Sequence, residues 1–177
     1  MWRQVQESVA SRAGHPAPAT GPDTKEWQMA FNVQGVHHIG LTVRDMQRSF
    51  EWYRRMFGFE PGPVNHAHGP DLERGVQVPG ADLSFSMIVV GNTRIEFLEY
   101  HEPEGEDWDR TNGDVGSAHI CLEVDDMAAA FADLESRGAV FNGPPVTLTD
   151  GELAGSQWAY LRDPDGIQLE IWQYPKR

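Results

Sequence analysis

The alternation of apolar and polar side chains predicts where the first strand and helix lie. Residues 36–43 alternate with a period of two, as expected for a strand, in which successive side chains point to opposite faces. Residues 45–57 instead carry apolar side chains at spacings of four, three and four, on one face of a helix: Met46, Phe50, Tyr53 and Phe57. Asp45 is a suitable N-cap, and Gly58 a suitable C-terminal stop.

The same kind of pattern continues to the end of the chain. Strands are predicted at 83–90 and 93–100, whereas 61–80, rich in Pro, Gly and His, is predicted to be a long loop. The second half repeats this plan, with a helix at 126–137 and strands at 118–124, 140–141, 158–162 and 166–174. The chain is therefore predicted to be an α+β protein with the order βαβββ twice.

The two halves are also related residue by residue. At an offset of 81 positions, 38–50 and 119–131 share seven identical residues out of thirteen, including His38 with His119. At an offset of 74, Ile95-Glu96-Phe97 aligns with Leu169-Glu170-Ile171. Such internal similarity indicates duplicated modules.

These patterns divide the chain into four segments. Residues 1–34 have no sustained period and are predicted to be a flexible or surface-laid extension. The first module is 35–102, an acidic connector exposed to solvent follows at 103–115, and the second module is 116–177.

Charge and composition narrow the class of protein. A net charge of -13 argues against nucleic-acid binding and against docking on an anionic membrane. No apolar run approaches the roughly 20 residues that cross a bilayer. The single cysteine, Cys121, cannot form an internal disulfide, which favours a reducing cytoplasm. A cytoplasmic protein that acts on a small molecule is therefore expected.

The repeated His and Glu residues are the main candidates for chemistry. Alternation places His38 and Glu96, and likewise His119 and Glu170, on the faces that point away from the helices. Both Glu residues stand between apolar neighbours, where a buried carboxylate needs a cation or a proton. Two imidazoles and two carboxylates suit one divalent metal ion, namely Zn, Ni, Co, Mn or Fe.

The same faces carry four large side chains: Leu98, Tyr100, Trp172 and Tyr174. If the sheets curl, these side chains line a concave aromatic cup that suits a substrate. The other histidines, His37, His66, His68 and His101, are weaker candidates. A histidine on a strand is often a hydrogen-bonded structural residue, and His66 and His68 fall in the predicted loop, where solvation is expected.

The chain resembles the vicinal oxygen chelate superfamily, which includes glyoxalase I, methylmalonyl-CoA epimerase, extradiol dioxygenases and fosfomycin or bleomycin resistance proteins. The resemblance runs from Gly35 to about Pro175 and is carried by VHHIGLTVRDM, FEWYRRMFGF, GNTRIEFLEY, AHICLEVDDM and LRDPDGIQLEIWQYP. It implies paired modules curled around one metal, with the ligands on His38, Glu96, His119 and Glu170. The site would form within one chain or across a swapped dimer, and a homodimer is expected.

The resemblance also implies an activity. Four ligands with Glu at both second positions look more like glyoxalase I or the epimerases than like the dioxygenases, which use three. The implied enzyme is a lyase or isomerase that moves a proton beside a carbonyl through a metal-bound enediolate, with Glu170 or Glu96 as the base. Thr42 and Tyr100 replace residues that glyoxalase I enzymes often have, an Arg and an Asn, which argues against glutathione binding. The alternatives are an extradiol-type ring-cleaving dioxygenase, which would use Fe(II) or Mn(II), and a non-catalytic module that binds a drug or another ligand.

Overall fold

A computed structural model of the chain describes residues 31–107 and 111–175. Most of the predicted N-terminal extension, residues 1–30, lies outside the described residues. A compact unit begins at Val36 and carries all the helices and strands named below. Within the described residues, no helix is long and apolar enough to span a bilayer.

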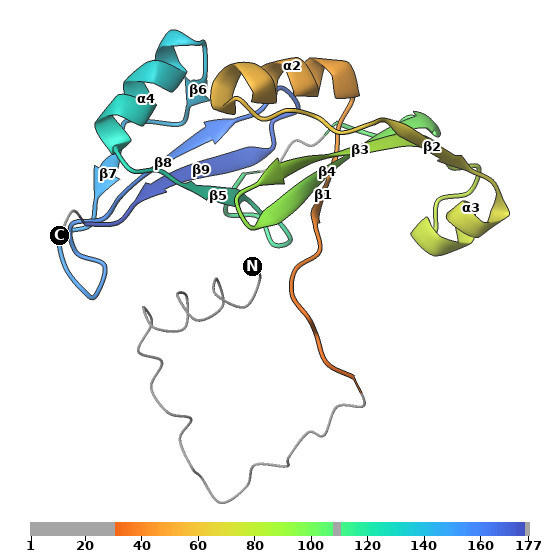
Figure 1. Cartoon of the computed structure of the whole chain (residues 1–177), viewed down its shortest axis with the longest axis horizontal. Helices are drawn as coiled ribbons and strands as arrows, with labels where there is room; N and C mark the ends of the chain where they lie inside the picture. The colour runs from red at the N-terminus through yellow and green to blue at the C-terminus, as the bar shows by residue number, and fades with distance from the viewer. Residues whose placement is uncertain (1–30, 108–110, 176–177) are drawn as a thin grey trace, which may run out of the picture. The chain divides into compact units, whose positions relative to one another are not determined.

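The first module contains one sheet and two helices. Its sheet has the strand order β1-β4-β3-β2, with β1 parallel to β4 and the other pairs antiparallel (Figure 1). The elements in chain order are β1 (Ile39–Thr42), α2 (Met46–Phe57), β2 (Asn65–His68), α3 (Pro70–Val76), β3 (Asp82–Val90) and β4 (Thr93–Glu102).

The prediction of a long loop at 61–80 was wrong, because β2 and α3 lie there. β2 has no apolar alternation, since it is a short edge strand whose residues are mostly exposed, and its pairing with β3 is what defines it. α3 has Pro70 at its start and acidic residues in its first turn, but it buries no side chain. The sequences of β2 and α3 therefore lack the apolar periodicity that predicts helices and strands.

The second module repeats the plan with shorter strands. Its sheet has the order β5-β9-β8-β6, with β7 also paired to β8. The elements are β5 (Ile120–Glu123), α4 (Met127–Ser136), β6 (Val140–Phe141), β7 (Val146–Thr147), β8 (Gln157–Arg162) and β9 (Gln168–Gln173). Among the elements of the second module, only β7 was not predicted, because its two residues are exposed and too few to show a period.

Both long helices begin in the same way. The N-caps Asp45 and Asp126 accept a hydrogen bond from the backbone N–H three residues later, at 2.9 and 3.0 Å. In addition, Glu99 of β4 accepts from the first N–H of α2, and Gln173 of β9 accepts from the first N–H of α4. These N–H groups have no partner inside their helices, so the side chains fix each helix to its sheet at equivalent places.

One apolar core joins the two modules. α2 and α4 lie on the same side of the two sheets (Figure 1), and buried residues from both modules form a single cluster. The Phe97 ring, which has no exposed surface, contacts Phe50 and Tyr53 of α2 with centroid distances of 5.6 and 5.0 Å. Arg137 of the second module donates to the carbonyl of Arg55 at 2.9 Å. The predicted α+β fold of paired βαβββ modules is confirmed, with α3 and β7 added.

Candidate metal and substrate site

Each module brings one histidine beside one glutamate. His38 and His119 each stand two residues before the position that lies directly opposite Glu96 or Glu170 in the parallel pairs β1–β4 and β5–β9. The Nε2 to Oε2 distance is 3.2 Å between His38 and Glu96, and 3.0 Å between His119 and Glu170. The sequence repeat therefore corresponds to the same backbone register in both sheets.

These distances agree with two neighbouring ligands on one cation. Imidazole nitrogen and carboxylate oxygen bind zinc-like ions at about 2.1 Å, so neighbouring ligands are roughly 3.0 Å apart in an octahedron and 3.4 Å in a tetrahedron. Both pairs fall in this interval, and the donor set suits a divalent transition metal. Each pair of residues therefore fits the metal that the sequence predicts.

The two pairs remain separate from each other in the described chain. No three of the four residues have ligand atoms that all lie within 4.8 Å of one another, and the only such group of His, Cys, Asp or Glu among the described residues is His66, Asp82 and His101. A four-ligand site therefore stays a prediction, and it requires either that the two pairs of one chain come closer together or that a second copy of the chain supplies the other pair.

The two carboxylates have different surroundings. Glu170 is only 7% exposed and lies opposite Cys121 of β5 and Tyr160 of β8, and the Tyr160 hydroxyl is 3.3 Å from His119 Nε2. Burial is the main cause that raises the pKa of the Cys121 thiol to about 12, and the negative charge of Glu170 is the second cause. The same two causes, in the same order, raise the pKa of Tyr160. A neutral thiol and a neutral phenol therefore flank this carboxylate.

The corresponding neighbours in the first module are nonpolar. Glu96 lies opposite Gly40 of β1 and Met87 of β3, so neither flanking residue offers a polar side chain. Tyr160 was not among the predicted site residues. The available signal was its place in a predicted strand two residues after Trp158, which puts both side chains on one face. The repeat thus supplies equivalent His–Glu pairs in two unlike settings.

The four predicted substrate-binding side chains occupy the same faces as the glutamates. Leu98 and Tyr100 follow Glu96 at spacings of two along β4 and are half-buried, as is Trp172 after Glu170. Tyr174 is 53% exposed and meets Trp172 edge to face at 6.0 Å. Trp158 of β8 lies directly opposite Trp172, which extends the aromatic surface of the second module.

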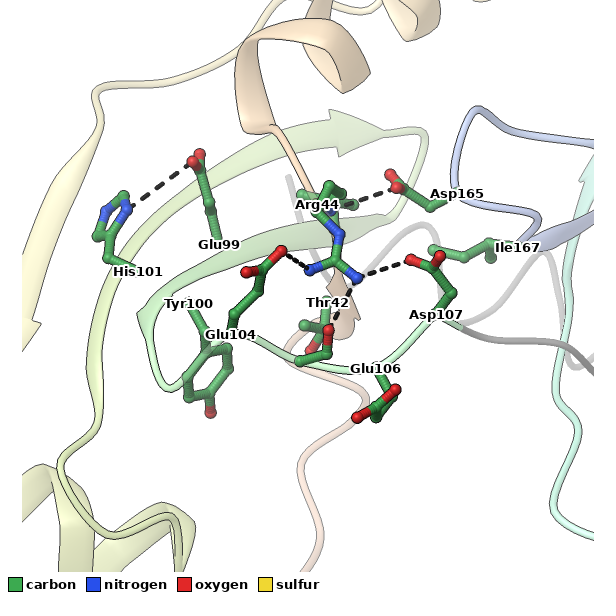
Figure 2. Close-up of a pocket in the computed structure, with 12 residues that line it drawn as sticks. Thr42, Arg44, Glu99, Tyr100, His101, Glu104, Glu106, Asp107, Asp165 and Ile167 are labelled. Atoms are coloured by element: carbon green, nitrogen blue, oxygen red, sulfur yellow. Dashed lines mark hydrogen bonds and ion pairs between the residues drawn. The ribbon is translucent and has the colours of Figure 1, made fainter.

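A cavity of about 290 Å³ lies where β1 and β4 end, beside the connector between the modules (Figure 2). Arg44 donates to Glu104 at 2.9 Å, to Asp107 at 2.6 Å and to the carbonyl of Gly105 at 2.8 Å. The hydrogen bond to Asp107 is the main cause that raises the pKa of Arg44. The Glu104 and Asp107 carboxylates of the connector are exposed, as predicted, but they are also held by this arginine. The arginine of this cavity is thus already paired with two carboxylates.

Known proteins resemble this chain over most of its length. The model of the family described as "Glyoxalase/Bleomycin resistance protein/Dioxygenase superfamily" matches residues 35–171. A 2-epi-5-epi-valiolone epimerase from an Actinomyces species is 33% identical over 145 residues, which cover 79% of each chain. The mitochondrial methylmalonyl-CoA epimerase of Mus musculus is 26% identical over 98% of this chain and 90% of its own. A lactoylglutathione lyase from Pseudomonas aeruginosa is 29% identical over 89% and 90%, respectively.

Solved structures show the same fold. A glyoxalase family protein from Bacillus cereus matches with a TM-score of 0.69 at 18% identity, over 84% of this chain and all of that one. A glyoxylase/bleomycin resistance protein/dioxygenase domain from Frankia matches with a TM-score of 0.56 at 25% identity, over 82% of this chain and 95% of that one. The chain therefore belongs to the glyoxalase/bleomycin resistance protein/dioxygenase superfamily.

Proposed function

We propose that this protein is a divalent-metal-dependent epimerase, which inverts a carbon next to a carbonyl by removing and returning a proton. The observation that carries the proposal is the pair of equivalent His–Glu contacts at 3.2 and 3.0 Å. Two of the named relatives, at 33% and 26% identity, are epimerases, which favours this reaction over the lyase reaction.

His38, Glu96, His119 and Glu170 would hold the metal. A divalent cation at this site would supply the positive charge that stabilises the developing charge on a substrate oxygen. Inversion requires a proton to leave one face of the carbon and return to the other. Glu170 and Glu96 come from equivalent positions of two modules, so one carboxylate would accept the proton from one face of the carbon, and the other, in its protonated form, would donate a proton to the opposite face; exchange with solvent would then restore both groups.

The charges of the protein favour an uncharged substrate. The chain carries a net charge of -13, and Arg44 is already paired with Glu104 and Asp107. A polyanion such as a CoA thioester would meet unfavourable electrostatics at such a surface. Half-buried Leu98 and Trp172 would contact the carbon skeleton instead. A small uncharged hydroxyketone is therefore the proposed substrate class.

Proton exchange tests the reaction directly. Protein purified without chelator or nickel affinity is analysed for metal, then incubated in D2O with 2-epi-5-epi-valiolone, with methylmalonyl-CoA, and with the methylglyoxal–glutathione hemithioacetal. We expect about one divalent metal ion per site and deuterium incorporation next to the carbonyl of the hydroxyketone. Bound iron, together with consumption of oxygen when a catechol is added, would instead indicate a dioxygenase. The lack of any bound metal would contradict both the epimerase and the dioxygenase assignments.

A variant separates the site from the rest of the protein. Glu170→Gln should abolish deuterium incorporation while circular dichroism stays unchanged, because the amide is a poor base and a poor metal ligand. Glu51→Gln is the matched control, since Glu51 is an exposed carboxylate on α2 whose side chain accepts from Gln47. Full activity in Glu170→Gln would contradict the proposal.

A further inference from the structure

We propose that His66, Asp82 and His101 form a second site for a divalent transition metal, separate from the His–Glu pairs described above. Their ligand atoms all lie within 4.8 Å of one another, and His66 Nε2 is 3.1 Å from Asp82 Oδ1. The three residues come from three neighbouring strands, β2, β3 and β4. This inference does not depend on the proposed epimerase activity.

Strand pairing and alternation bring the three side chains together. His66 lies directly opposite Ser84, and Asp82 is two residues before Ser84, so these side chains share one face. The register of β3 and β4 shifts between Asp82 and Leu83, and His101 is left without an opposite residue. His101 stands two residues after Glu99, so alternation directs its side chain to the face of Glu99 and Ser84. His101 Nε2 accordingly lies 2.8 Å from the Ser84 hydroxyl, on the same face.

This face is opposite to the one that carries Glu96. Ser84 lies across from Glu99, whose carboxylate accepts from the first N–H of α2, so both belong to the helix-bearing face of the sheet. Glu96 stands three residues before Glu99 on the same strand, and alternation directs it to the other face. A cation bound to His66, Asp82 and His101 would therefore lie on the other side of the sheet from the His38–Glu96 pair.

The chemistry of the group suits a cation that arrives from solvent. The side chains of His66, Asp82 and His101 are 49%, 40% and 42% exposed, so an ion can reach them and keep bound waters. Two imidazoles and one carboxylate are ligands for Zn, Ni, Co, Fe or Cu. The 3.1 Å separation also falls in the interval of roughly 3.0–3.4 Å expected for neighbouring ligands.

One oxygen of this group favours an added ligand. Asp82 Oδ1 is shielded from solvent and accepts no hydrogen bond from the residues that the structure describes, although His66 is near. A shielded acceptor without a hydrogen bond costs free energy, which coordination to a cation would relieve. The bound ion would also link the edge strand β2 to β3 and β4.

A cobalt titration of the full-length protein tests the site. After removal of any affinity tag, Co(II) is added to metal-free protein and followed by its visible absorption and by elemental analysis after gel filtration. We expect the His66→Gln/His101→Gln variant to bind one equivalent less than the wild-type protein. A His38→Gln/His119→Gln variant should still bind that equivalent. Equal binding by the wild-type protein and His66→Gln/His101→Gln would overturn the proposal.

Further variants keep the test independent of folding and of the proposed function. Asp82→Asn should also lose the equivalent, whereas Asp71→Asn, which removes an exposed carboxylate on α3 that pairs with Arg74, should retain it. Circular dichroism checks that each variant is folded. If the wild-type protein binds a single equivalent that depends on His66 and His101, the second site stands and the proposed epimerase site fails.

Discussion

Asp163 offers the most direct test of the energetics of this fold. It begins the turn between β8 and β9 and is only 6% exposed. Its Oδ1 accepts the backbone N–H groups of Asp165 and Ile167, both at 2.9 Å, and its Oδ2 accepts the Tyr53 hydroxyl at 3.3 Å. Burial raises the pKa of Asp163 from 3.8 to about 6, and these hydrogen bonds only partly offset that rise. The folded protein therefore binds this proton more tightly than the unfolded chain does.

The sign and size of the effect on stability follow from this pKa. Between pH 3.8 and 6 the folded state holds more protons, so the free energy of unfolding falls as the pH rises. The pKa of Asp163 is higher by 6 − 3.8 = 2.2 in the folded protein than in the unfolded chain. This difference lowers the free energy of unfolding above pH 6 by about 3 kcal/mol, relative to its value in acid. From pH 5 to 7.5 the change due to Asp163 is about 1.4 kcal/mol.

Substitution with asparagine isolates this contribution. Asp163→Asn keeps the side-chain shape and the oxygen that accepts both backbone N–H groups, but it carries no charge at any pH. Urea unfolding at pH 5, 6 and 7.5 should show that the variant lacks about 1.4 kcal/mol of the decline seen in the wild-type protein. Asp71→Asn, which removes an exposed carboxylate, is the control, and its stability should change with pH as that of the wild-type protein does. Parallel pH curves for Asp163→Asn and the wild-type protein would refute the reasoning.

Three other predictions address the core, the assembly and the connector. Phe97→Ala should lower the free energy of unfolding in urea by about 3–5 kcal/mol, because the ring is fully buried between β4 and α2; a change below about 1 kcal/mol would contradict this packing. Mixing His38→Ala and His119→Ala chains after unfolding and refolding should restore about a quarter of the metal sites if each site forms across a swapped dimer, and none if it forms within one chain. Arg44→Ala should speed cleavage at 104–107 by a glutamate-specific protease, since three hydrogen bonds of the connector are lost; an unchanged rate would show that Arg44 does not hold the connector.

The fold was predictable wherever a segment buries one face. Apolar residues at helical spacing marked α2, and alternation marked β3 and β4, because burial imposes a period on the sequence. β2 and α3 bury too little to show such a period, and the structure assigns them through pairing with β3 and through local hydrogen bonds. The internal repeat marked the His and Glu positions, since both modules use the same register to place them.

The sequence by itself predicted the duplicated architecture and the two His–Glu pairs, because these depend on local periodicity and on a repeat visible along the chain, and its motifs carried the resemblance to the superfamily. Only the tertiary structure decided which side chains from distant segments meet. It set Tyr160 beside His119, linked Arg44 to the connector, and paired β2, β3 and β4 so that His101 meets His66. Strand register and bulges depend on pairing between segments far apart in the chain, and no local pattern of residues specifies them.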